Sequence, residues 1–252
     1  MPEAVSAYAE SGDVREVREI QNHILDSYVL DFAKHTSGAE LPRMRQIWDS
    51  LPVQLARENK RFFFSAAREG ARARDYEDAV LWLEGAGLIH RSFAVETPRL
   101  PLRAHSNRQL FKVYVLDVGL LGALSRLDPS VLLLGDAAFR EYRGAFVENY
   151  VAQELRAALG TELYYWRNRR TSAEVDFLFE SSAAVVPLEA KAGINPKSKS
   201  LRTLGSSMGL TRLLRTTALN LRRDGSILNV PLYAAHLVPE IAAGRLDADP
   251  AI

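Results

Sequence analysis

The most restrictive feature of this sequence is a pair of short segments, 173–180 and 183–191, that are separated by only two residues. In the first segment Val175, Phe177 and Phe179 alternate with other residues, which is the period of a strand with one buried face. A two-residue link between two strands predicts a tight antiparallel hairpin. The chain must therefore form a sheet, and the polar residues of the hairpin must share one face of it.

The hairpin predicts which charged side chains lie together. A link formed by two residues pairs positions whose numbers sum to about 363, which places Asp176 opposite Pro187. Directly opposed residues share a face, so Asp176 lies on the side of Glu189 and Lys191, with Glu189 as a diagonal neighbour roughly 7–8 Å away. A slip of one residue would move Asp176 to the other face, so this prediction depends on the register.

A third carboxylate comes from a helix predicted over 139–159. Glu148 lies at the edge of the apolar face of this helix, where a carboxylate requires a partner. Its neighbours at helical spacings of three, four or seven residues are Gly144, Val151, Ala152 and Leu155.

These four residues form the predicted catalytic site. Acidic oxygens suit a hard cation, so Glu148, Asp176 and Glu189 are the predicted ligands of Mg²⁺ or Mn²⁺. The metal would activate a water and neutralise charge on a phosphodiester, while Lys191 would hold the water or the phosphate. The alternative is a salt bridge between Lys191 and Glu189 or Asp176 on an exposed sheet face. For any one of these residues considered alone, the salt bridge is the preferred interpretation. For the four residues together, the metal site is preferred.

The N-terminal half carries the period of helices instead of strands. Its order of helix, helix, helix, strand, loop, strand is that of a winged helix-turn-helix. The expected helices cover 14–35, 44–55, 75–84 and 118–124, and the expected strands 88–95 and 110–116.

The helix expected to enter a DNA groove, 75–84, is acidic, and Asp75 is its predicted N-cap. Phosphates would repel this helix, so a structural or dimerisation role of the module is preferred over groove reading. Its acidic residues are Asp75, Glu77, Asp78 and Glu84.

The C-terminal half returns to short strands around two helices, which predicts an α/β unit with one sheet. The predicted fold class is therefore mixed α/β, with a helical winged-helix-like domain before an α/β core with a central mixed sheet. The expected domains are an N-terminal linker helix (1–36), the winged-helix-like domain (37–135) and the α/β core (136–252). Strands are expected at 162–166, 173–179, 184–191, 212–218 and 230–237, and a helix at 199–208.

Composition excludes several kinds of site. The chain contains no cysteine, so disulfides, thiolate catalysis and cysteine-based metal sites are excluded, and its five histidines show no HExxH pairing. No run of about 18 apolar residues and no N-terminal apolar segment occur, which predicts a cytoplasmic protein.

Charge gives only local information about partners. The formal net charge is +1, which does not favour a polyanionic partner. Between positions 167 and 223, however, eleven basic residues face four acidic ones, which favours phosphate binding. The predicted nucleic-acid contacts are Arg167, Arg169, Arg170, Lys197 and Lys199.

Several of these segments resemble the PD-(D/E)XK nuclease-like domain. More closely, the chain is similar to the C-terminal region of a group of prokaryotic AAA-plus ATPases, in which a domain of unknown function follows the ATPase module. The segments that carry the resemblance are 146–154, 165–167, 173–177 and 187–193, together with residues 1–3, 31–32, 112–114 and 117–120.

The resemblance implies a winged helix followed by a restriction-endonuclease-like core. It places Asp176, Glu189 and Lys191 at the core motif and Glu148 on the preceding helix. The implied function is that of a Mg²⁺-dependent nuclease acting on nucleic-acid phosphodiesters, DNA more than RNA, with an ATPase module as a partner and a homo-oligomer as an option.

The sequence departs from such ATPases because it contains no GxxxxGK[ST] loop. We therefore expect no ATP hydrolysis by that route and regard the chain as the C-terminal part of an ATPase-type protein. Two alternatives stay open: a non-catalytic nucleic-acid-binding or protein-interaction module that regulates an ATPase partner, and a structural remnant.

Overall fold

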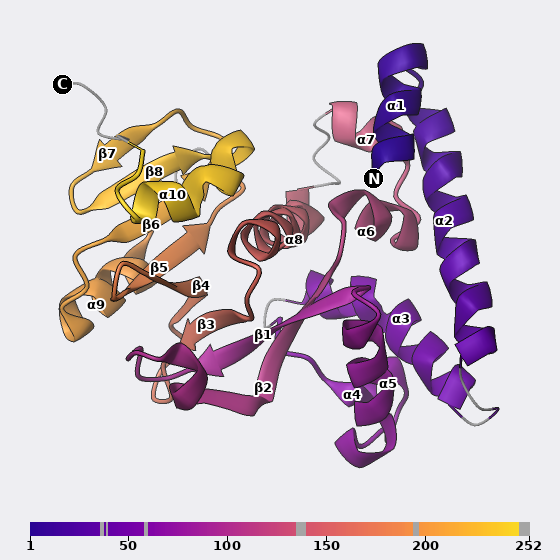
Figure 1. Ribbon diagram of the computed structural model, residues 1–252, viewed down its shortest axis with the longest axis horizontal. Helices are drawn as coiled ribbons and strands as arrows, with labels where there is room; N and C mark the ends of the chain where they lie inside the picture. Colours follow the sequence, from indigo (N-terminus) through magenta and orange to yellow (C-terminus); the bar gives the residue numbers. More distant parts are fainter. Residues whose placement is uncertain (36–37, 39, 58–59, 135–139, 194–196, 247–252) are drawn as a thin grey trace. The chain divides into compact units, whose positions relative to one another are not determined.

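The chain forms a mixed α/β fold with one eight-stranded mixed sheet, which confirms the predicted fold class. The computed structural model describes residues 1–35, 38, 40–57, 60–134, 140–193 and 197–246 (Figure 1). In the described part of the chain, none of the helices combines the length and the apolar composition needed to cross a bilayer.

The chain divides into two compact units. Unit 1 comprises Met1–His90 and Val113–Phe146, and unit 2 comprises Arg91–Lys112 and Val147–Ile252. The sequence instead assigned both strands of the expected winged-helix hairpin to the first domain. In the structure these strands join the common sheet, so their residues 91–112 group with unit 2. The domain boundary expected at 135/136 lies outside the described residues.

Unit 1 is built from helices around an aromatic core. The ring of Phe32 is fully buried and meets Trp48 and Trp82 edge-on, with centroid separations of 5.9 and 5.6 Å. The helices at Val14–His35 and Val118–Leu124 have the predicted bounds. The helices of this unit are α1 (Pro2–Ser11), α2 (Val14–His35), α3 (Glu40–Ala56), α4 (Phe64–Ala67), α5 (Ala73–Gly85), α6 (Val118–Leu124), α7 (Pro129–Leu134) and the first part of α8 (Arg140–Leu159).

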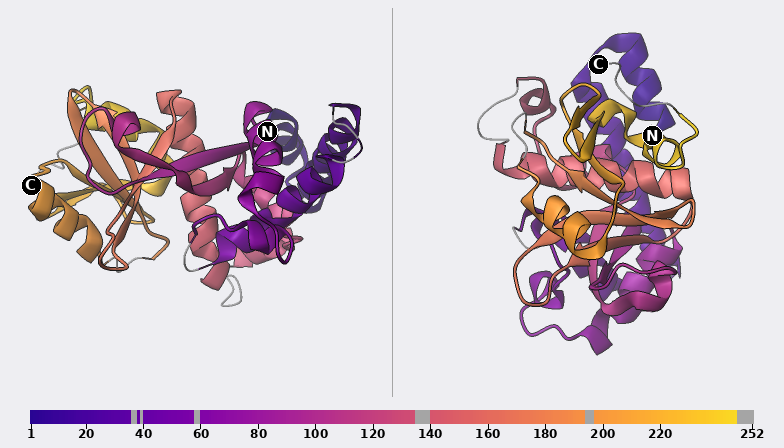
Figure 2. Two further views of the ribbon diagram at one scale, coloured as in Figure 1. Left: turned by 90° about the horizontal axis from the view of Figure 1, so that it is seen from below. Right: turned by 90° about the vertical axis from the view of Figure 1, so that its left-hand side faces the viewer.

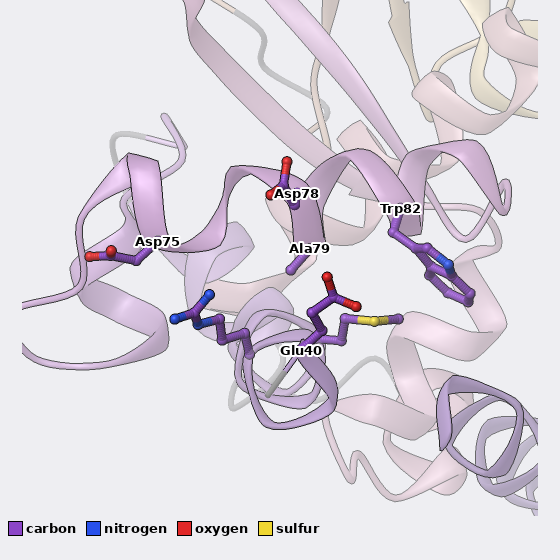
Figure 3. A pocket seen from close by; sticks show the side chains of 7 residues that line it. Glu40, Asp75, Asp78, Ala79 and Trp82 are labelled. Atoms are coloured by element: carbon purple, nitrogen blue, oxygen red, sulfur yellow. The ribbon is translucent and has the colours of Figure 1, made fainter. Parts of the chain in front are cut away.

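The acidic helix α5 borders a pocket against α3 (Figure 3). Asp75 does not cap this helix, because the helix begins one turn earlier and its N-cap is Arg72, so the prediction for Asp75 was wrong. Asp75 and Asp78 are among the residues that line the pocket, together with Glu40 and Trp82 (Figure 3).

The sheet runs through the order β2-β1-β3-β4-β5-β6-β8-β7 (Figures 1 and 2). The pairs β1/β3, β5/β6 and β6/β8 are parallel, and β3/β4, β4/β5 and β7/β8 are antiparallel. The strands are β1 (Ile89–Val95), β2 (Ser106–Val115), β3 (Leu163–Arg167), β4 (Glu174–Ser181), β5 (Ala184–Ala190), β6 (Leu213–Thr217), β7 (Arg222–Asp224) and β8 (Ile227–Pro231).

The helices near the C-terminus partly follow the sequence pattern. Helix α9 (Lys199–Met208) has the predicted bounds. The strand expected over 230–237 was wrong beyond Pro231, because the chain continues there as a 3₁₀ helix, η3 (Leu232–Leu237), and then as α10 (Val238–Ala242).

The predicted register of the β4/β5 hairpin was wrong by two. Ser181 pairs with Ala184 and Leu178 with Pro187, so paired positions sum to 365 and the turn consists of Ser182 and Ala183. An even shift leaves every side chain on its predicted face. Continued by one pair, the observed register sets Asp176 directly opposite Glu189, and the predicted apolar side is buried at Val175, Phe177 and Phe179.

The turn of this hairpin offers a test of the corrected register. Ser182 and Ala183 have φ values of 48° and 59°, which non-glycine residues adopt at a cost. We expect Ala183→Gly to raise the free energy of unfolding by about 0.5–1 kcal/mol. Ala184→Gly, one residue further in the extended strand, should lower it. Thermal melting of both variants measures the difference, and an equal loss of stability in both would contradict the left-handed turn.

Candidate functional site

The hairpin of unit 2 brings Asp176, Glu189 and Lys191 together, as the sequence predicted. Oδ2 of Asp176 accepts a hydrogen bond from the backbone N–H of Ala190 at 2.9 Å. Nζ of Lys191 lies 3.1 Å from Oε1 of Glu189. Burial acts to lower the pKa of Lys191, but the charges of Asp176 and Glu189 outweigh it and raise that pKa above its ordinary value. Lys191 is therefore a cation at neutral pH.

A second lysine, Lys112 of β2, occupies the centre of the carboxylate cluster. Its side chain is only 1% exposed, and its Nζ lies 3.0 Å from Oε1 of Glu148 and 2.5 Å from Oε1 of Glu174. Oδ1 of Asp176 is 4.0 Å away, and the ring of Tyr165 lies below the ammonium at 4.9 Å. All of these residues belong to unit 2.

The electrostatics of Lys112 hold it in the charged form. Burial acts to lower the pKa of this ammonium, while Glu148, Glu174 and Asp176 raise it, and the net result is a pKa well above the ordinary value. A buried charge of this kind is tolerated only when it is paired. Lys112 is thus a charged ammonium that is paired with the carboxylates around it.

Sequence reasoning did not assign a role to Lys112. The available signal was a lone lysine within an otherwise apolar strand segment, Phe111–Val115, because a charged residue at such a position requires a counterion. Its partners are 36, 62 and 64 positions away, and no local spacing connects them.

Glu148 has the partner that the sequence required of it. It projects from α8 and is 4% exposed. Its Oε1 accepts a hydrogen bond from the ammonium of Lys112. Its charge is therefore paired with the ammonium of Lys112, and its role as a metal ligand stays a prediction.

One oxygen of Glu189 is in a different situation. The side chain is 5% exposed and Oε1 faces Lys191, but Oε2 is buried and accepts no hydrogen bond from the described residues. A buried carboxylate oxygen without a donor is unfavourable by roughly 1–3 kcal/mol or more. Such an atom is suited to receive a cation or a donor from a ligand.

The residues fit a divalent cation with two protein ligands. Among the described residues, no three Asp, Glu, His or Cys side chains are arranged as a metal-binding group, so the predicted set of Glu148, Asp176 and Glu189 is not seen as such. Mg²⁺, however, commonly takes one or two carboxylates and completes its shell with water and phosphate oxygens. Asp176 and Glu189, with its unpartnered oxygen, supply that pair.

A buried arginine extends the polar row across the sheet. Arg215 pairs in register with Glu189 on one side and Asn229 on the other, and its side chain is 1% exposed. Its Nε donates to Oδ1 of Asn229 at 3.1 Å, its Nη1 to Oγ of Ser198 at 3.4 Å, and its Nη2 to Asp224. Arg215 is one of the eleven basic residues between positions 167 and 223, and the sequence pattern predicted no separate role for it. In the structure it connects β6, β7 and β8 to the start of α9.

The predicted nucleic-acid contacts come from two segments. Arg167, at the end of β3, is half-buried and pairs in register with Glu174. Arg169 is exposed and forms an ion pair with Glu96, while Arg170 is exposed. The exposed Lys197 and Lys199 precede and begin α9.

Comparison with known protein families matches both parts of the chain. Residues 1–131 match the family described as Domain of unknown function (DUF8612), and residues 143–233 match Domain of unknown function (DUF4143). The second domain is commonly found with AAA-type ATPases. The boundary expected at 135/136 falls between the two matched ranges.

Two curated relatives are similar over most of this chain. They are the Uncharacterized protein Rv2008c of Mycobacterium tuberculosis and the Uncharacterized protein Mb2031c of Mycobacterium bovis, each 30% identical over 203 residues. The alignment covers 75% of this chain and 42% of each relative, so the chain spans less than half of their length. No solved structure matches the chain.

The buried ion pair of Lys112 and Glu148 predicts a specific pattern of stability. Lys112→Met leaves the buried Glu148 without its ammonium and should lower the free energy of unfolding by about 3–5 kcal/mol. Lys112→Met combined with Glu148→Gln should cost less than Lys112→Met alone, because no unpaired charge then remains at this pair. Chemical denaturation of the single and double variants measures both values. Additive losses would contradict the pairing.

Proposed function

This chain belongs to the DUF8612 family, and we propose that its unit 2 is a metal-dependent nuclease-like domain that acts on nucleic-acid phosphodiesters within an AAA-plus ATPase-type protein. The observation that carries the proposal is the convergence of Asp176, Glu189 and Lys191 on one face of the hairpin. The buried, unpartnered Oε2 of Glu189 supports it, because that oxygen lacks the donor or cation that its burial requires.

Asp176 and Glu189 are the residues that would hold Mg²⁺ or Mn²⁺. When bound, the metal would lower the pKa of a water molecule and neutralise charge on the phosphodiester. The chain contributes orientation to this site. The backbone N–H of Ala190 fixes Asp176, and the ammonium of Lys191 fixes Oε1 of Glu189.

Lys191 has the properties of a positively charged phosphate-binding group rather than of a general base. Its raised pKa keeps it protonated at neutral pH, so it cannot take a proton from water there. With 38% of its side chain exposed, the ammonium is accessible to a substrate. We assign it the role of binding a non-bridging oxygen of the scissile phosphate, as a compact point charge.

The exposed basic residues support nucleic acid as the substrate, with DNA preferred over RNA. Arg170, Lys197 and Lys199 are exposed and can contact phosphates, whereas the charge of Arg169 is partly compensated by Glu96. Contacts of this kind provide affinity without sequence preference.

A second candidate function is that of a non-catalytic module that binds nucleic acid or a protein and regulates an ATPase partner. It is favoured by Lys112, whose ammonium already neutralises part of the carboxylate cluster. The two candidates differ in one observable result, because only the first includes cleavage.

The nuclease proposal predicts that the purified chain cleaves DNA only when Mg²⁺ or Mn²⁺ is present. Asp176→Asn should abolish cleavage, because it removes the charge of one of two metal ligands, and Lys191→Met should lower the rate by roughly 100-fold or more. Asp26→Asn, an exposed aspartate of α2, is the matched control and should not change it.

Gel assays with duplex DNA, single-stranded DNA and RNA make the measurement. Cleavage that survives Asp176→Asn, or an unchanged cleavage rate in Lys191→Met, would contradict the nuclease proposal. Binding without cleavage, under every divalent metal tested, would favour the regulatory module.

The basic segments predict a separate effect on affinity. Arg170→Ala should weaken nucleic-acid binding to a similar extent for all sequences and lower the slope of log K against log salt by about 1. Arg45→Ala, an exposed arginine of α3, should leave both unchanged. Fluorescence anisotropy at several salt concentrations measures both quantities, and an unchanged slope in Arg170→Ala would exclude this residue as a phosphate contact.

A further inference from the structure

We infer that the segment 91–108 of unit 2 is a nucleic-acid-binding surface, whose residues Arg103 and Arg108 contact phosphates of the backbone. The segment runs from β1 through the 3₁₀ helix η1 (Leu102–His105) into β2. The inference rests on the proposed function for the class of its ligand, and it adds a surface to which the sequence pattern assigned no role. It requires neither a metal ion nor cleavage.

The formal charge of the chain is distributed unevenly between the two units. Unit 2 contains 18 basic and 12 acidic residues, a formal charge of +6, whereas unit 1 contains 14 and 19, a formal charge of −5. The segment 91–108 has four arginines and one acid, so it contributes +3 to the charge of unit 2. The overall value of +1 therefore conceals a basic unit, which favours a polyanionic partner for unit 2.

Arg103 and Arg108 share one carboxylate, that of Glu162. Nη2 of Arg108 donates to Oε1 of Glu162 at 2.8 Å, and Nε of Arg103 lies 4.0 Å from Oε2 of the same side chain. The hydroxyl of Tyr164 also donates to Oε2, at 2.9 Å. Two guanidinium groups thus face one carboxylate, and this group of three charges keeps a net charge of +1.

Both guanidinium groups are accessible to a ligand. The side chain of Arg103 is 79% exposed and that of Arg108 is 45% exposed. Cζ of Arg108 lies 3.5 Å from the centroid of the Phe93 ring, so the ring and Glu162 fix this side chain before a ligand binds. A fixed side chain loses less conformational entropy on binding, and a guanidinium can donate two hydrogen bonds to one phosphate.

A second basic group, the predicted contacts Arg169 and Arg170, lies at the other end of β3. Arg169 follows this strand and forms an ion pair with Glu96, which follows the neighbouring strand β1 (Figure 1). Glu162, by contrast, directly precedes β3. The strand has five residues, so its length separates the two basic groups by roughly 15 Å.

This separation favours a polymer over a small phosphate compound. The phosphates of one DNA strand follow each other at about 3.4 Å along the helix axis, so two groups roughly 15 Å apart match a run of about four or five phosphates. Inorganic phosphate can occupy only one of the groups at a time. A nucleic-acid backbone can contact both, and these contacts provide affinity without reading the sequence.

The inference is tested by fluorescence anisotropy of the whole chain with duplex and single-stranded DNA, at several salt concentrations and in EDTA. Arg103→Ala and Arg108→Ala should each lower the slope of log K against log salt by about 0.9 for duplex and about 0.7 for single-stranded DNA, because each removes one phosphate contact. Arg103→Lys keeps the charge and should keep the slope. Arg245→Ala, an exposed arginine that also pairs with a glutamate, is the matched control and should not change it.

Glu162→Gln tests the surface in the opposite direction. It removes the negative charge between Arg103 and Arg108 at nearly constant side-chain size, and it should raise the affinity for DNA by about 2- to 5-fold. A variant that fails to fold cannot produce such a gain. Thermal melting checks the folding of each variant. If Arg108→Ala does not fold, Arg103→Ala and Glu162→Gln decide.

Three results would overturn the inference. The first is an unchanged slope in both Arg103→Ala and Arg108→Ala, and the second is an equal decrease in Arg245→Ala. The third is competition by polyglutamate that equals competition by unlabelled DNA at the same concentration of charges, which would indicate an acidic protein segment as the partner.

The outcomes also distinguish this inference from the proposed function. Metal-dependent cleavage by a chain whose slope does not respond to Arg103→Ala or Arg108→Ala would exclude the surface and leave the nuclease proposal intact. The expected changes in slope, without cleavage under any divalent metal, would support the surface and contradict the nuclease proposal.

Discussion

The structure of unit 2 depends on one buried ammonium. Lys112 joins a residue of α8 and two residues of β4 to strand β2, across more than 35 positions of sequence. The buried charges of Lys112 and Glu148 are stable together because each has an opposite charge nearby, and the partly exposed Glu174 and Asp176 add two more carboxylates around the ammonium. The same arrangement determines which carboxylates are left for other ligands, so packing and the chemistry of the site have a common origin.

Local patterns were sufficient to predict much of the fold. The amphipathic periods of α2 and α9 and the short apolar segment of α6 gave these helices their observed bounds. The face of Asp176 and Glu189 was also predicted, although the register was wrong by two, because a shift by an even number keeps each side chain on its side of the sheet. The error arose at Ser182 and Ala183, which adopt a left-handed turn without the glycine or asparagine that usually indicates one.

Long-range pairing explains what the sequence did not reveal. Lys112 and Arg215 are isolated basic residues in apolar strands, and their partners become neighbours only when the order of the strands is known. The assignment of β1 and β2 to the common sheet has the same cause, since their hairpin pattern is compatible with a separate winged helix. The end of β8 depends on Pro231 and the 3₁₀ turn that follows, where apolar residues continue without a strand.

Lys112 is the last residue of a segment of unit 2, and the next residue, Val113, begins a segment of unit 1. This position limits where the protein can be divided into stable fragments. The ammonium belongs to the segment matched by DUF8612, whereas Glu148, Glu174 and Asp176 belong to the segment matched by DUF4143. A fragment cut at the border between the two families would therefore leave the buried Glu148 and the partly exposed Glu174 and Asp176 without this counterion. The two segments match different families, but ion pairs between Lys112 and the acids of the second segment connect them. A shorter expression fragment of the C-terminal half must therefore include β1 and β2 to be stable.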